Sequence, residues 1–116
     1  MKGGDELPAR SAYESMWLVA MFDLPVGTPE DRRAYTQFRN QLIGAGFSML
    51  QFSVYYRFCK SEHSAGQIMK EVRPALPSYG QVRFLMVTEK QFAKMKTYIG
   101  KKPAEKEKPP EQLMFF

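Results

Sequence analysis

Asp23 is the residue whose position in the sequence most clearly indicates a chemical function. It follows six consecutive apolar residues, 17–22, and Pro25 stands two positions after it. A short unbroken apolar run that ends at a turn signal is typical of a strand covered on both faces, and proline ends a sheet ladder because it has no N–H to donate. We therefore expect Asp23 at the very end of a buried strand, where its carboxylate either forms the turn or binds a ligand.

The ligand-binding interpretation of Asp23 requires a second carboxylate. A lone aspartate does little for phosphodiester hydrolysis, but two aspartates across a two-fold axis could hold one hydrated Mg²⁺, a hard cation that takes oxygen ligands. The ion could then polarise a phosphate and supply hydroxide. The structural alternative is that the carboxylate accepts hydrogen bonds from the amides of the turn at residues 24–27.

Five basic residues are candidates for a phosphate-binding face. Arg32, Arg33 and Arg39 fall in an expected helix, and Arg57 and Lys60 follow an extended segment. The net charge of +5 favours a polyanionic partner such as nucleic acid. For any single residue of the five, an ordinary solvated surface position is the competing interpretation. Each true phosphate contact on duplex DNA would add about −0.9 to the log–log salt slope of binding.

Cys59 and His63 are weaker candidates. Cys59 could act as a nucleophile if Arg57 or Lys60 stabilised its thiolate, but no histidine or acid stands at a fitting spacing, so a structural thiol is favoured. His63 adjoins Glu62 at an expected helix start, where a solvated position is favoured over an acid–base role.

The composition predicts a single globular domain in a reducing compartment. The chain has 116 residues, 44% of them apolar, and one cysteine, which excludes an internal disulfide. No stretch approaches the roughly 20 apolar residues that a membrane helix needs, and residues 1–15 lack the apolar core of a signal peptide. We therefore expect a cytoplasmic protein with no membrane partner.

The element that carries Asp23 is expected over residues 15–23, and a helix follows it. Thr28 is a good N-cap and Pro29 suits the first helical position, so a helix is predicted over 29–43. Gly44-Ala45-Gly46 ends this helix, because glycine tolerates the left-handed conformation of a C-cap. The apolar residues of this helix recur at helical spacing and are Tyr35, Phe38 and Leu42.

The rest of the chain supplies further strands and helices. Residues 47–58 are rich in aromatic and β-branched types and predict either two short strands that turn near Gln51–Phe52 or one long kinked strand. A second helix, capped by Ser61 or Ser64, would bury Ala65, Ile68, Val72 and Leu76. A strand is expected over 82–87, then a short helix that buries Phe92 and Met95.

The domain boundaries follow from shifts in composition. Residues 1–14 predict a mobile tail, and residues 15–99 a folded domain. Residues 100–111 are charged and proline-rich, which predicts a linker. Residues 112–116 are apolar again. Exposure of apolar side chains to water is unfavourable in free energy, so we expect this segment to dock as an added strand.

The element order β-α-β-β-α-β indicates an α+β domain of the ferredoxin-like type. Both helices then cover one face of the sheet, yet the strands at 15–23 and 82–87 are apolar on both faces. The second face needs a cover, and the simplest cover is a second copy of the chain. The sequence therefore predicts a face-to-face homodimer, which brings the two Asp23 residues toward each other.

Several short motifs together resemble a known family. They are Met21-Phe22-Asp23-Leu24-Pro25-Val26, Asp31-Arg32-Arg33 with Phe38-Arg39, the run from Gly46 to Arg57, Leu76-Pro77 with Gly80-Gln81-Val82-Arg83, Thr88-Glu89-Lys90-Gln91-Phe92, and Pro110-Glu111-Gln112-Leu113. With these motifs the chain resembles the small CRISPR-associated endoribonucleases, second of the two conserved spacer-acquisition proteins. Within that family it looks like the branch that accompanies type II systems.

The resemblance implies a function in CRISPR adaptation. It implies a homodimer whose C-terminal strand, 112–116 here, extends the partner's sheet, and which bridges the spacer-integrating enzyme and binds duplex spacer DNA. It also implies a Mg²⁺-dependent endonuclease activity on RNA or DNA, with Asp23 in the position of the family's metal-binding aspartate. The alternative is a ferredoxin-like RNA-binding or ligand-sensing module without catalysis and outside CRISPR systems.

Overall fold

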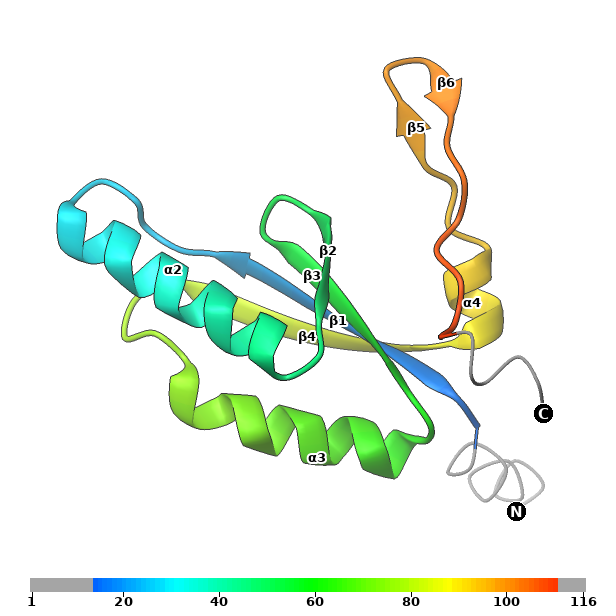
Figure 1. Cartoon of the computed structure of the whole chain (residues 1–116), viewed down its shortest axis with the longest axis horizontal. Helices are drawn as coiled ribbons and strands as arrows, with labels where there is room; N and C mark the ends of the chain where they lie inside the picture. Colours follow the sequence, from blue (N-terminus) through cyan, green and yellow to red (C-terminus); the bar gives the residue numbers. More distant parts are fainter. Residues whose placement is uncertain (1–13, 111–116) are drawn as a thin grey trace, which may run out of the picture.

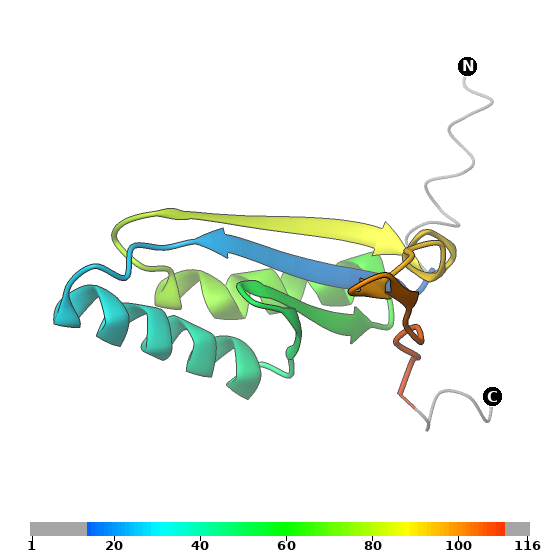
Figure 2. The ribbon, with the colours of Figure 1, turned by 90° about the horizontal axis from the view of Figure 1, so that it is seen from above.

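Four strands form one antiparallel sheet, and two long helices cover one of its faces (Figures 1 and 2). The structure is a computed structural model that describes residues 14–110. Residues 1–13 of the predicted tail 1–14, and the predicted docking strand 112–116, lie outside the described residues. The sheet strands are β1 (Met16–Asp23), β2 (Ser48–Gln51), β3 (Val54–Cys59) and β4 (Gln81–Thr88). The helices are α2 (Pro29–Gly44), α3 (Glu62–Val72), the 3₁₀ turn η2 (Arg73–Ala75) and α4 (Glu89–Ala93).

The strand order β2-β3-β1-β4 confirms the ferredoxin-like α+β arrangement. β1 lies in the interior of the sheet and pairs with both β3 and β4. The segment 47–58 forms two strands and not one, and the turn between them lies at Phe52–Ser53. Ser53 has a φ of 64°, so this turn uses a left-handed residue without a glycine.

Both long helices begin where the sequence predicts. Thr28 caps α2 in a capping box with Asp31, and Ser61 caps α3. The row Ala65, Ile68 and Val72 is buried as expected, but Leu76 is 41% exposed. Leu76 leaves the row because the helix ends at Val72 and η2, which contains Pro74, turns the chain away.

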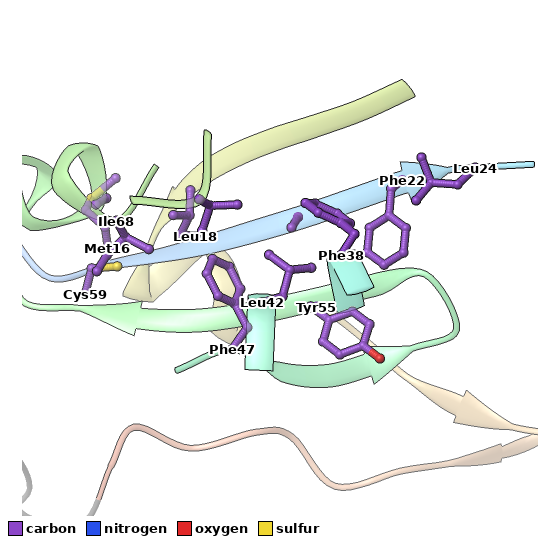
Figure 3. Packing of buried hydrophobic residues seen from close by; sticks show 13 residues of the cluster. Met16, Leu18, Phe22, Leu24, Phe38, Leu42, Phe47, Tyr55, Cys59 and Ile68 are labelled. Carbon is purple, nitrogen blue, oxygen red and sulfur yellow. The ribbon is translucent and has the colours of Figure 1, made fainter. Parts of the chain in front are cut away.

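The main core lies between the sheet and the two long helices (Figure 3). Alternate residues of β1 point into it, among them Leu18 and Phe22. From α2 come Phe38 and Leu42, which are almost fully buried. This core fixes the position of β1 and, with it, the backbone at Asp23.

The opposite face of the sheet is only partly covered by the chain itself. Trp17 is 2% exposed because Phe92 of α4 stacks on it, with ring centroids 4.2 Å apart. Beyond this cover, Leu85 of β4 is 49% exposed, and its register partner is Val19. Among the described residues, α4 therefore covers the Trp17 end of this face and leaves Leu85 exposed, and the expectation that a second copy covers the face stays a prediction.

A small hairpin follows α4 and projects from the sheet (Figure 1). It pairs β5 (Tyr98–Ile99) with β6 (Lys102–Pro103), and Gly100 turns it with a φ of 64°. The first residues of the predicted linker 100–111 therefore belong to this hairpin. Among residues 14–110, no helix is both long and apolar enough to span a bilayer.

Candidate functional site

Asp23 is the last residue of β1 and its side chain is exposed, as the sequence predicts. Because side chains alternate along a strand, Asp23 shares the face of Trp17, Val19 and Met21, the face that α2 and α3 leave uncovered. The hydrogen bonds near the following turn are made by Thr28, Asp31 and Arg32. None of these bonds involves Asp23, and the ligand-binding interpretation of its carboxylate stays a prediction.

Two polar residues of β4 lie beside Asp23 on the same face. Gln81 is the register partner of Asp23, and Arg83 is the partner of Met21. The Arg83 Nη2 atom donates to the Gln81 Oε1 atom at 3.3 Å. Arg83 is exposed, so the end of β1 presents a carboxylate with a cation one diagonal step away. Sequence reasoning missed Arg83 as a site residue, although pairing β4 with β1 in the ferredoxin-like order would have found it.

The backbone at Asp23 is held from two sides. The Phe22 N–H donates to the Ser53 carbonyl at 3.0 Å, which ties the end of β1 to the β2–β3 turn. Gly80 has a φ of 91°, and a Cβ built on it would lie 2.5 Å from the Asp23 carbonyl oxygen. Phe22 itself packs against Phe38 and Tyr55, at ring-centroid separations of 5.2 and 5.7 Å (Figure 3). The backbone position of Asp23 is therefore set by the core.

Asp23 is the candidate metal ligand at the end of β1. Among residues 14–110, no three side chains of the His, Cys, Asp or Glu types gather closely enough to hold an ion. Mg²⁺ usually keeps several waters and takes one or two carboxylates together with substrate phosphates. The exposed Asp23 carboxylate could serve as one such ligand.

That the five basic residues form one phosphate-binding face stays a prediction; three of them lie on α2. Arg32 and Arg39 lie on one side of α2 because they are seven positions apart, while Arg33 is rotated about 100° from Arg32. Arg32 Nη1 donates to the Val26 carbonyl at 3.1 Å, and Arg39 Nε donates to the Tyr55 hydroxyl at 2.7 Å. The two remaining residues lie elsewhere, Arg57 against Gly46 beyond the C-terminus of α2 and Lys60 exposed after β3.

The structure assigns no catalytic chemistry to Cys59 or His63. Cys59 is 2% exposed, and burial raises the pKa of its thiol above the ordinary 9.0 although Arg57 acts in the opposite direction. A raised pKa disfavours the thiolate, so Cys59 is a packing residue. His63 is exposed on α3, with Nε2 3.3 Å from the Gln67 amide nitrogen.

Comparison with known proteins identifies the family. The model of the CRISPR associated protein Cas2 family matches residues 16–95. A CRISPR-associated endoribonuclease Cas2 of Flavobacterium psychrophilum is 43% identical over 104 residues, 90% of each chain. A protein of the same name from Parvibaculum lavamentivorans is 46% identical over 101 residues, 87% of this chain and 100% of the relative. Another, from Paracidovorax avenae, is 42% identical over 106 residues, 91% of this chain and 98% of the relative. The chain therefore belongs to the CRISPR associated protein Cas2 family.

Proposed function

We propose that the chain is a CRISPR adaptation subunit: a homodimer that binds duplex spacer DNA, bridges the spacer-integrating enzyme, and cleaves RNA or DNA through paired Asp23 residues with Mg²⁺. The observation that carries the proposal is the exposed Asp23 carboxylate at the end of β1, on the sheet face that the chain leaves partly open. Membership of a family whose relatives are named endoribonucleases supports it. That membership also disfavours the alternative of a module outside CRISPR systems.

The partly open sheet face supports the homodimer. Leu85 is 49% exposed there, and the neighbouring Met21 and Val54 are half-buried. Full burial of a leucine or valine side chain contributes about 1.5–3 kcal/mol of favourable free energy. A dimer that buries several such side chains on this face is stabilised by each of them. In a two-fold packing the two Asp23 residues meet if the axis passes near the end of β1, which is the arrangement that we propose.

Each side chain at the end of β1 has a part in the proposed cleavage. A bound Mg²⁺ ion supplies Lewis-acid polarisation of a phosphate and a more acidic water. The two Asp23 carboxylates hold that ion through oxygen ligands. Arg83 lies where its guanidinium can pair with a phosphate oxygen and hold the strand in place. Gln81 accepts from Arg83 and keeps its side chain along β4.

The nuclease part of the proposal is tested with an isosteric variant. Wild type and Asp23→Asn are compared on single-stranded RNA and duplex DNA, with Mg²⁺ and with EDTA. We expect Asp23→Asn and EDTA each to abolish cleavage, while Glu71→Gln, an exposed carboxylate change on α3, cleaves like wild type. Equal cleavage by wild type and Asp23→Asn would refute the assignment of the activity to Asp23.

The scaffold part is tested separately, because bridging needs no cleavage. Asp23→Asn should still bind duplex DNA and co-purify with the integrase. Arg83→Ala should reduce the magnitude of the log–log salt slope for duplex binding by about 0.9 if its contact is one phosphate. Failure of wild type to bind duplex DNA or integrase at low salt would overturn the scaffold role.

A further inference from the structure

The tip of the β2–β3 hairpin carries an aromatic side chain that lies mostly outside the core. Phe52 is 76% exposed, more than any other large apolar residue among those the structure describes. Its ring stacks on Tyr35 of α2, with centroids 5.7 Å apart and planes 17° apart. Tyr35 is tied in turn to the hairpin, its hydroxyl lying 2.9 Å from Ser53 Oγ. One face of a fixed aromatic pair is therefore offered to solvent.

The turn that positions Phe52 contains a residue in an unfavourable backbone conformation. Ser53 adopts a φ of 64°, a left-handed conformation that a serine rarely takes. The Tyr35 hydroxyl and the Phe22 N–H both hold this residue, the second through the Ser53 carbonyl. A position kept in a sparsely populated conformation by surrounding contacts is a reason to look for a function there.

Cations flank the aromatic pair on the same side of α2. Arg32 lies three positions before Tyr35 and Arg39 four positions after it, spacings that share a helix face. The nearby Asp31 carboxylate is engaged in the cap, where it accepts from the Thr28 N–H at 3.3 Å. We call the residues Arg32, Tyr35, Arg39 and Phe52 the α2–hairpin strip. An exposed aromatic surface between two arginines is the combination that single-stranded nucleic acids require.

We propose that the α2–hairpin strip binds a single-stranded nucleic acid, with an unpaired base stacked on Phe52 and phosphates paired with Arg32 and Arg39. Seven residues of helix separate the two arginines by about 10 Å along its axis, so the two guanidinium groups can reach different phosphates of one strand. A duplex keeps its bases stacked inside and offers no free base face. The strip therefore distinguishes unpaired from paired nucleic acid.

The strip lies apart from the surface used by the proposed homodimer. Tyr35 belongs to α2, which covers one face of the sheet, while Leu85 and Asp23 belong to the other. A second copy packed on the open sheet face therefore lies on the opposite side of the sheet from Tyr35. The inference rests on the proposed function only in that both require nucleic-acid binding, and it adds a separate site for unpaired nucleotides.

The test compares single strands with blunt duplexes on the full-length chain. Fluorescence anisotropy is measured with single-stranded DNA, single-stranded RNA and blunt duplex DNA at low salt. We expect Phe52→Ala to weaken binding of the single strands by about 5-fold to 150-fold and to leave duplex binding unchanged. Phe52→Trp should restore single-strand binding, because it restores an aromatic face. Tyr98→Ala removes another exposed aromatic, on the separate β5–β6 hairpin, and should bind like wild type.

A second readout reports the stacking itself. An oligonucleotide that contains 2-aminopurine should lose fluorescence on binding wild type or Phe52→Trp, and should not on binding Phe52→Leu. Phe52→Leu keeps an apolar contact with Tyr35, so it serves as the variant that retains the fold, which thermal unfolding checks.

Each of several results would overturn the inference. They are single-strand binding by Phe52→Ala equal to wild type, an equal loss of duplex binding, an unquenched 2-aminopurine with wild type, or a changed oligomeric state of Phe52→Ala. Wild-type binding to blunt duplex alone would overturn this inference and leave the scaffold role standing. Wild-type binding to no nucleic acid would overturn both.

Discussion

Replacing Gly80 by alanine should destabilise the protein and displace the Asp23 backbone. Gly80 has a φ of 91°, a conformation that costs an L-residue about 1–3 kcal/mol. The new Cβ would also lie 2.5 Å from the Asp23 carbonyl oxygen and 2.8 Å from Leu24 Cδ2. Because the first of these atoms belongs to the backbone, the end of β1 has to move. At about 4–8 °C per kcal/mol for a domain of this size, the strain alone should lower the Tm by at least about 4 °C.

The assay is thermal unfolding of Gly80→Ala beside a matched glycine-to-alanine variant. Gly66 lies in the middle of α3, and a Cβ there would meet nothing within 4 Å. Gly66→Ala should therefore stabilise the protein by about 0.5–1 kcal/mol through helix propensity alone. Cleavage by Gly80→Ala, measured well below its Tm, should fall because Asp23 has moved. A Gly80→Ala protein as stable as wild type would refute the reasoning about this contact.

Two further predictions concern the packing of the sheet faces. Phe92→Ala should cost about 3–5 kcal/mol in urea unfolding and shift the Trp17 fluorescence to the red, because the buried Phe92 ring stacks on Trp17; an unshifted spectrum would contradict the role of α4 as a cover. Burial raises the pKa of Cys59 above 9.0, so its contribution to stability is complete below about pH 9 and is lost as the pH rises through the folded-state pKa. Cys59→Ala should therefore lose less stability than wild type between pH 8 and pH 10, and parallel losses would contradict the assignment.

Local sequence signals were sufficient for the elements that carry the site. The apolar run that ends at Asp23, the Thr28 cap and the buried row of α3 all depend on neighbours within a few positions. The two-strand form of residues 47–58 stayed open because its turn lacks the usual signal: Ser53 takes the left-handed position without a glycine, held by contacts with Tyr35 and Phe22.

What sequence reasoning missed depends on contacts between distant parts of the chain. The stacking of Phe92 on Trp17 arises only when β4 runs antiparallel to β1 and delivers α4 to the second face. The same register brings Arg83 near Asp23. The phosphate-binding face formed by the five basic residues stays a prediction, because charge alone does not specify where a side chain lies. The assignment to the type II branch stays a prediction.

The separation of the two Asp23 carboxyl groups in a structure of the protein purified with Mn²⁺ or Mg²⁺ tests the central claim most directly. Metal–oxygen bonds of about 2.0–2.1 Å for Mg²⁺ require the two groups to lie within roughly 6 Å if they share one ion. We predict a dimer packed through the sheet face that carries Leu85 and Asp23, with the carboxyl groups inside that limit. A monomer, or a dimer joined through α2 and α3 with the two groups far apart, would contradict the account.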